Sequence, residues 1–176
     1  MRLASANRLR WAGLGTAVVL AMAAIVIAVI WHQNVVPQKE AVANIVKAGA
    51  VCLYDFEYDF TPSVGCIPGY RRPLTPSPLL QLALGNDAIA TPVYVQLTGR
   101  QVGDGDVARI CDSLVRLPTV RHLNLRGTEV SDKSIECLSR LHQLVVLDIR
   151  QAAITPSGVR SLQGSLPACR ILSGID

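Results

Sequence analysis

Few residues in this chain are arranged for chemistry, and the best candidate for a catalytic group is a single histidine. His122 could act as a general base beside a serine or cysteine nucleophile only if Asn124 or Asp148 oriented its imidazole ring. The chain has no Gly-x-Ser-x-Gly motif, no phosphate-binding loop and no His-Glu-x-x-His motif. We therefore expect no enzyme and no cofactor, and we interpret His122 as a solvated residue of a binding face.

Metal binding is the second chemistry to consider, because three aspartates lie close together in the sequence. Asp104, Asp106 and Asp112 do not have the ligand spacing of a calcium loop, and no Cys-x-x-Cys or Cys/His spacing points to zinc. Acidic residues are also favourable at the start of a helix. We interpret these aspartates as helix-start charges and predict no metal site.

Five cysteines cannot all form pairs within one chain. Cys52 and Cys66 bracket the same irregular region, so a disulfide between them is a hypothesis for an oxidising compartment, with two reduced thiols as the alternative. Cys111 and Cys137 fall in segments expected to be helical, where we interpret them as packed thiols. Cys169 occupies an apolar position of a repeated segment, which predicts a buried core residue.

The elements that must position these residues come from an internal repeat. Val120–Arg126 returns 24 residues later as Leu144–Arg150. An earlier copy around Val95 aligns at an offset of 28, and Cys169, which aligns with Leu144, begins a closing strand. Three copies and a terminal strand are close to the minimum that stacked repeats need for stability.

Each copy predicts a strand, a turn and a short helix. Leu123 and Leu125 are two residues apart, so a strand directs both side chains to one side. Gly127 breaks the strand, and residues 131–134 resemble a helix start. A helical face with three-residue spacing follows: Ile135, Leu138 and Leu141. One copy cannot bury its apolar side alone, so we expect an α/β fold in which neighbouring copies stack.

One segment resembles the leucine-rich-repeat family, in the short strand-plus-helix form related to its cysteine-containing subtype. Its sequence is Leu123-Asn124-Leu125-Arg126-Gly127-Thr128-Glu129-Val130-Ser131-Asp132. Leu166–Ile171 is similar to the closing unit of small bacterial membrane-anchored proteins of this type. The resemblance covers residues 78–172 and implies a curved solenoid with a role in protein interaction and no catalytic residues. The chain departs from the family pattern at Gln151–Ala153 and at Gly103–Asp106.

The outward side of the strands is the predicted binding face. Alignment of the copies places these residues on it, together with Val146: Tyr94, Gln96, Thr98, His122, Asn124, Arg126, Asp148 and Arg150. Arg126 and Arg150 offer planar forks for carboxylates or backbone oxygens, and the alternative is that the face is merely solvated. Three short strands cover roughly 200–250 Å², whereas a standard interface needs about 800 Å² per partner. We therefore expect weak binding, a contribution from loops, or avidity from a membrane dimer.

A membrane segment precedes the repeats. Trp11–Trp31 contains no charged residue, and its helical length of roughly 30 Å matches a bilayer core. Tryptophans at both ends suit the two lipid interfaces, so we expect Trp11–Trp31 to contact membrane lipid. Arg2, Arg8 and Arg10 precede it, which predicts a single-pass protein with a cytoplasmic N-terminus and an extracytoplasmic repeat domain. A cleaved signal peptide is the alternative.

Gly13, Ala17 and Ala21 recur four residues apart in this segment. Such a small-residue face would let two helices approach closely and so form a homodimer. Small residues are also common in membrane helices without any such role, and both interpretations stay open.

The segment between membrane and repeats predicts a cap for the first repeat. We expect a helix over Pro37–Lys47, a strand over Val51–Tyr58, a proline-rich loop over Thr61–Pro78 and a short helix over Leu79–Leu84. Solenoid ends expose apolar edges that need such covers. An independent sensor domain is the alternative, but this short, proline-rich segment would build a poor core. The predicted parts are a basic tail (1–10), a transmembrane helix (11–31), a capping region (32–91) and a leucine-rich-repeat domain (92–176).

The charge distribution does not indicate nucleic-acid binding. The net charge is +4, but three of the 17 basic residues lie in the first ten positions. From His32 onward the chain contains 14 basic and 13 acidic residues, which gives a net charge of +1. We expect a membrane-anchored protein-interaction or scaffold module with an unknown protein partner. The alternatives are a structural envelope component and an accessory subunit of a membrane enzyme complex.

Overall fold

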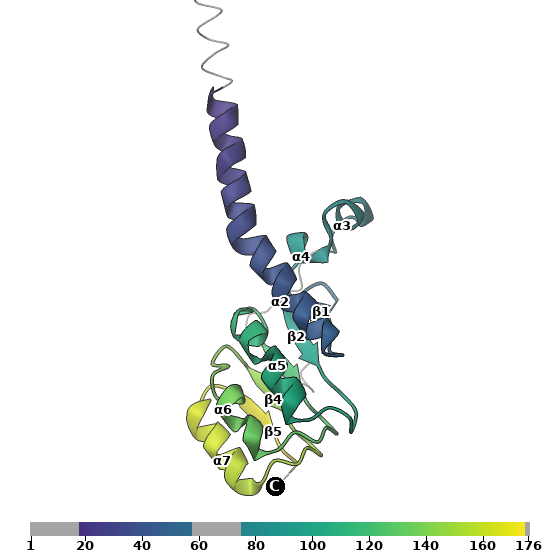
Figure 1. Ribbon diagram of the computed structural model, residues 1–176, viewed down its shortest axis with the longest axis vertical. Coiled ribbons are helices and arrows are strands. Elements are labelled where there is room, and N and C mark those ends of the chain that lie inside the picture. The colour runs from purple at the N-terminus through teal and green to yellow at the C-terminus, as the bar shows by residue number, and fades with distance from the viewer. Residues whose placement is uncertain (1–17, 58–74, 175–176) are drawn as a thin grey trace, which may run out of the picture. The chain divides into compact units, whose positions relative to one another are not determined.

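A computed structural model describes residues 18–57 and 75–174 of the chain (Figure 1). The chain divides into two compact units, Met1–Pro37 and Gln38–Asp176. The second unit is a mixed α/β domain built on one five-stranded sheet.

The described part of the first unit is an apolar helix. Residues 18–30 are helical and are followed by a π-helical turn, η1 (Trp31–Val35), and the helix Val18–Lys47 is long and apolar enough to cross a membrane, with a mean hydropathy of 2.0 in its most apolar window. None of that window is buried within the protein. The first seven residues of the predicted segment (11–17), which include Gly13 and Ala17, lie outside the described residues, whereas Ala21 is exposed on the helix.

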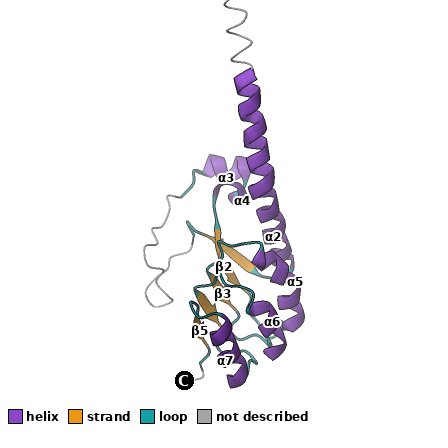
Figure 2. Cartoon of the chain, turned by 90° about the vertical axis from the view of Figure 1, so that its left-hand side faces the viewer, coloured by secondary structure: helices purple, strands orange, loops and turns teal. Residues whose placement is uncertain are grey.

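The sheet of the second unit has its strands in sequence order. They are β1 (Val51–Tyr54), β2 (Pro92–Gln96), β3 (His122–Asn124), β4 (Val146–Asp148) and β5 (Arg170–Leu172). β1 pairs with β2 in antiparallel fashion, and all later neighbours are parallel. Parallel neighbours require a crossover between strands, and helices supply it on one side of the sheet (Figure 2).

The parallel register follows the offsets of the sequence repeat. Val95 lies opposite Leu123, which is 28 residues later, and Leu123 lies opposite Leu147, 24 residues later. All three side chains are fully buried. Slipping the pairing by one residue would turn this apolar row to the other face of the sheet, so burial fixes the register.

The closing strand is one residue out of step with the sequence alignment. The Cys169 amide donates to the Leu166 carbonyl as the Leu144 amide donates to that of Leu141, so the two turns match as aligned. Ile171 nevertheless lies opposite Leu147, one position earlier than that alignment implies. Cys169 packs against the core while staying partly exposed, so our prediction of a buried core residue is only partly correct.

Helices cover the inward side of the sheet in sequence order. They are α5 (Asp104–Val115), the short η2–α6 segment (Asp132–Ser134 and Ile135–Leu138) and α7 (Pro156–Ser165). Their buried side chains include Ile110, Leu138 and Leu162, which face the apolar row of the strands in one core. α5 is the longest of the three because the four additional residues of the first copy fall within it.

The start of each helix is bonded to the start of the next. Asp104 accepts hydrogen bonds from the Ser131 amide (2.8 Å) and from the hydroxyls of Ser131 and Ser134 (both 2.6 Å). Asp132 accepts from the Thr155 amide (2.9 Å) and hydroxyl (2.6 Å) in the same way. Burial would raise the pKa of Asp104, but these donors outweigh it and the pKa is lowered. We call these two sets of bonds the aspartate ladder.

The aspartate ladder consists of the bonds to Asp104 and the bonds to Asp132, and the helix starts at its two ends lack the residues that would extend it. Gly103 stands before Asp104 where Ser131 stands before Asp132, so the first helix start offers no hydroxyl to a preceding carboxylate. Pro156 follows Thr155 where an aspartate would be needed to bond a further helix. Among the described residues the aspartate ladder thus joins three helix starts.

The predicted roles of the aspartates are correct for two of three. Asp104 and Asp106 lie in the first turn of α5, as expected. Asp112 lies near the other end of that helix and forms an exposed ion pair of 3.3 Å with Arg140, so it is not a helix-start charge. Among the described residues no group of three potential ligands could hold a metal ion.

A disulfide joins Cys111 of α5 to Cys137 of α6, with a Cα–Cα distance of 5.9 Å. This corrects our interpretation of both as packed thiols. Cys111 follows the core residue Ile110, and Cys137 precedes the core residue Leu138. The two sulfurs therefore lie on the facing flanks of adjacent helices. The hypothesis of a Cys52–Cys66 bridge is untested, because Cys66 lies outside the described residues.

The N-terminal end of the sheet carries the predicted helix and strand. α2 (Val36–Lys47) buries Ala41, Val42 and Ile45 against the core, and Gly49 follows its end with a positive φ of 85°. β1 adds an antiparallel edge. It ends at Tyr54 rather than at the expected Tyr58, because Asp55–Glu57 forms a turn in which the Glu57 amide donates to the Tyr54 carbonyl.

Two further helices follow, α3 (Pro78–Leu84) and α4 (Asn86–Ile89). α3 begins one residue before the predicted start, because Pro78 suits the first helical position after the N-cap Ser77.

Substituting Asp104 by alanine tests the aspartate ladder. We expect a loss of about 2 kcal/mol in the free energy of unfolding, because three donors to a carboxylate lose their acceptor. The matched control is Asp112→Ala, which removes only an exposed ion pair and should cost less than about 1 kcal/mol. Denaturant unfolding of the full chain in detergent measures both, and equal losses would contradict the ladder.

Removing the disulfide with the paired change Cys111→Ser and Cys137→Ser should lower the free energy of unfolding by roughly 3 kcal/mol, because the cross-link restricts the unfolded chain. Cys169→Ser serves as the single-thiol control. Peptide mapping without reductant should recover Cys111 and Cys137 in one linked fragment. Recovery of both as free thiols from protein isolated under oxidising conditions would show that the bond does not form.

Candidate binding surface on the strands

The strands bring the predicted binding residues together in three rows across the sheet. Pairing places Tyr94 opposite His122 and His122 opposite Val146, and the next outward positions align in the same way. The rows are Tyr94, His122 and Val146; Gln96, Asn124 and Asp148; and Thr98, Arg126 and Arg150. The three rows differ sharply in exposure, which sequence alignment alone does not reveal.

The first row is buried rather than solvated. His122 is 2% exposed, Tyr94 7% and Val146 2%. The rings of Tyr94 and His122 meet edge to face with centroids 4.8 Å apart. Burial lowers the pKa of His122 to about 4 despite the opposing charge of Asp148, so the imidazole is neutral at pH 7. Our expectation of a solvated His122 was wrong, and such a low pKa also makes it a poor general base.

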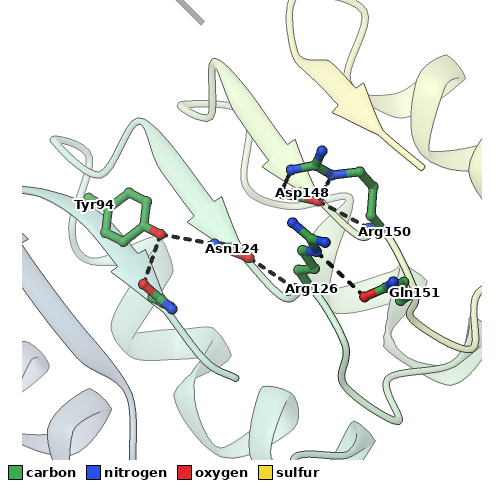
Figure 3. A network of polar contacts seen from close by, with 7 residues as sticks. Tyr94, Asn124, Arg126, Asp148, Arg150 and Gln151 are labelled. Atoms are coloured by element: carbon green, nitrogen blue, oxygen red, sulfur yellow. Dashed lines mark hydrogen bonds and ion pairs between the residues drawn. The ribbon is translucent and has the colours of Figure 1, made fainter. Parts of the chain in front are cut away.

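A chain of hydrogen bonds joins Tyr94 of the first row to Gln96 and Asn124 of the second row (Figure 3). The Tyr94 hydroxyl donates to Gln96 Oε1 (3.0 Å) and accepts from Asn124 Nδ2 (2.9 Å). Asn124 Oδ1 in turn accepts from the Arg126 amide (3.0 Å). The amide group of Asn124 is held at both ends, which fixes its orientation and joins β2 to the loop after β3.

Asp148 is a buried carboxylate with its own counter-ion. It is 3% exposed, and Arg150 binds it through Nε (2.9 Å), Nη2 (2.6 Å) and the backbone amide (3.1 Å). Burial alone would raise the pKa of Asp148, but the bonds and charge of Arg150, with the charge of Arg126, lower it. The guanidinium of Arg150 therefore binds Asp148 within the protein. We had expected this guanidinium to be available to a partner.

Arg126 keeps its exposed position at the end of the strand face. Its Nε reaches Gln151 Oε1 at 3.5 Å, a weak contact at the limit of hydrogen bonding. Figure 3 shows the guanidinium beside the Asp148–Arg150 pair. Of the two predicted guanidinium forks, the one on Arg126 is the more accessible to another molecule.

Gln151 adopts a backbone conformation that glycine supplies elsewhere. Its φ is +62°, the only positive value among the non-glycine residues that the structure describes. Gly99 and Gly127 take the equivalent positions in the two preceding loops, with φ of 108° and 71°. A left-handed conformation costs a side-chain-bearing residue about 1–2 kcal/mol. Strain of this kind is characteristic of functional positions.

Two shallow pockets flank Gln151 at the ends of the strands. The pocket on the β3 side has a volume of about 490 Å³ and is lined by Arg100, Gly127, Thr128, Glu129, Gln151, Ala152 and Ala153. The pocket on the β5 side, of about 460 Å³, is lined by Arg126, Arg150, Gln151, Ala152, Ser173 and Gly174. We call the exposed residues Arg100, Arg126 and Gln151, with these linings, the Gln151 edge.

Sequence reasoning identified Arg126 but missed Arg100 and Gln151 as surface residues. The signal for Gln151 was present in the departure from the family's glycine-containing turn at Gln151–Ala153. Arg100 follows Gly99, the glycine equivalent to Gln151, and could have been found by extending the alignment past the strand ends. The accessible chemistry at the Gln151 edge is that of hydrogen-bond donors and positive charge.

Stability should depend on pH through His122. Because its folded pKa of about 4 lies below the ordinary 6.5, the unfolded chain binds more protons between these values. The free energy of unfolding should thus fall by up to about 3 kcal/mol as the pH drops through this window. Asp148 and Asp104, whose pKa values are lowered in the folded protein, should reduce the free energy of unfolding only when the pH falls below about 4.

His122→Phe keeps an aromatic ring against Tyr94 and should flatten this dependence. The measurement is denaturant unfolding of the full chain in detergent across the window, with the exposed His142→Gln as control. An unchanged slope in His122→Phe would mean that another group carries the effect.

Comparison with protein-family models found no match, and comparisons with curated proteins and with solved structures found none either.

Proposed function

We propose that the chain is a membrane-anchored leucine-rich-repeat protein whose domain lies outside the cytoplasm and binds a protein partner through the Gln151 edge. The observation that carries the proposal is the strained Gln151 between two pockets, beside the exposed guanidinium of Arg126.

The repeat architecture is supported by three kinds of bonding between equivalent residues. Strands pair at the sequence offsets, as in Leu123 with Leu147. Loop amides follow the same pattern, since the Leu125 amide donates to the Asp148 carbonyl. The aspartate ladder connects helix starts at matching positions. A repeat in which each copy bonds only its neighbours is the arrangement expected of a solenoid.

The location is supported by the apolar helix and by the disulfide. The helix Val18–Lys47 has the length and composition to cross a membrane. Arginines at positions 2, 8 and 10 place the preceding tail on the cytoplasmic side by the positive-inside rule. Structural disulfides persist in oxidising compartments, and the Cys111–Cys137 bond agrees with a domain on the opposite side.

The partner is inferred from the charge and shape of the Gln151 edge. Arg100 and Arg126 are exposed guanidinium groups, against the exposed carboxylate of Glu129. Arginine forks match carboxylates and backbone carbonyls in planar geometry. The burial of the first row leaves less strand surface than the sequence indicated, so the loops must supply much of the contact. A protein segment presenting acidic side chains or free carbonyl groups fits these features.

Charge reversal at Arg126 tests this proposal. Arg126→Glu should reduce partner capture about ten-fold or more, because it turns attraction into repulsion at the contact. Arg160→Glu makes the same charge change on the exposed face of α7 and should leave capture unchanged. The measurement is quantitative affinity capture from solubilised membranes with the full chain. Equal capture by the wild type and Arg126→Glu would remove the Gln151 edge from the proposal.

Gln151→Gly separates binding from folding in the same assay. Glycine relieves the left-handed strain, so the variant should be at least as stable as the wild type. It should nevertheless capture less partner, since the side chain between the pockets is gone. Undiminished capture would show that the strain at Gln151 has no part in binding.

A further inference from the structure

Helix α3 exposes its leucines instead of burying them. Leu79 is 78% exposed, Leu82 86%, Leu80 50% and Leu84 39%. The polar Gln81 is only partly exposed, and its side chain donates to the Pro76 carbonyl at 3.1 Å. No charged residue occurs within α3. A surface helix of a soluble domain has the opposite arrangement, with its apolar stripe on the core.

The structure holds α3 in this orientation by bonds to both of its ends. Ser77 caps the start, accepting from the Leu80 amide at 3.3 Å. Lys39 Nζ donates to the Leu84 carbonyl at 3.4 Å, and Gln38 Nε2 donates to the carbonyl of Ala90, just beyond α4, at 3.0 Å. The leucine helix is therefore attached to the first residues of the α/β domain.

Those first residues lie close in sequence to the apolar segment. The large apolar side chains between Val18 and Ile30 are 47–70% exposed, and Trp31 closes the segment. Gln38 follows Trp31 by seven residues, which span about 10 Å when helical and about 25 Å when fully extended. The headgroup layer on each side of a bilayer core is about 5–8 Å thick. Gln38 thus lies no more than about 25 Å from Trp31, the residue that closes the apolar segment, whatever the orientation of the domain.

We infer that α3 is a second membrane contact, with Leu79, Leu80 and Leu82 inserted into the lipid interface. The inference rests on the proposed membrane anchor. An uncharged leucine surface this close to the bilayer is suited to acyl chains, and no charge in α3 opposes its insertion. The domain is then attached at two points, which restricts its rotation about the spanning helix and limits the directions in which the Gln151 edge can face.

Site-specific photolabelling tests this contact in the full chain reconstituted into phosphatidylcholine vesicles. A diazirine amino acid replaces Leu82 in one sample, Ile25 of the apolar helix in a second and Gln163 of α7 in a third. Gln163 is exposed and belongs to α7, which lies at the opposite end of the domain from α3 (Figure 1). We expect about ten-fold more lipid adduct at position 82 than at position 163, because an interfacial helix buries its apolar face among acyl chains.

The three positions separate the two proposals. Lipid adducts at Ile25 and none above the Gln163 level at Leu82 would overturn the second contact and leave the anchor intact. Absence of lipid adducts at both Ile25 and Leu82 would overturn both. Adducts from Leu82 to protein in place of lipid would assign α3 to a second copy or another subunit, and would also refute the inference.

Discussion

The requirement that each strand–loop–helix segment be covered by its neighbours governs the whole α/β domain. A strand of three residues and a helix of one or two turns have too little apolar surface to fold alone. Leu123, Leu125 and Leu138 of the central segment become fully buried only between the segments on either side. The backbone bonds, the aspartate ladder and the Cys111–Cys137 bond all run between neighbours, so each contact that positions one segment also positions the next.

The same requirement leaves two ends that must be closed by different means. At the first strand, α2 and β1 supply Ile45 and an antiparallel edge, which stop the parallel pairing. At the last, β5 brings Ile171 only partly into the core, and Pro156 removes the carboxylate that a further helix start would need. The N-terminal end is the better buried of the two, and it is the end that follows the apolar helix in the chain.

Sequence periodicity predicted the pairing of the strands, which depends on residue spacing. It did not predict the burial or the bonding of individual side chains, which depend on the residues around them. The offsets of 24 and 28 predicted the partners of Leu123 correctly, since one residue of slip would reverse the faces of the sheet. His122 was expected to be solvated because alternation shows which face a residue is on, not what covers that face. The pairing of Cys111 with Cys137 needed the relative position of two helices, although their places beside Ile110 and Leu138 were a usable signal. Tyr54 ended its strand early because Glu57 closes a turn that alternation cannot reveal.

The strand face uses most of its polar groups internally, and this determines what remains for another molecule. Asp148 is buried and would be costly without Arg150, so that arginine is needed for folding before it could serve in binding. Asn124 is likewise held between Tyr94 and Arg126. What remains exposed on this face is Thr98, Arg126 and the residues around Gln151, and three short strands cover only roughly 200–250 Å². A surface of that size can still select a partner if both molecules are confined to one membrane, because confinement raises their effective concentration. Under the proposed function, the apolar helix would contribute to recognition as well as to location, because a domain released from the membrane would meet its partner at a lower effective concentration.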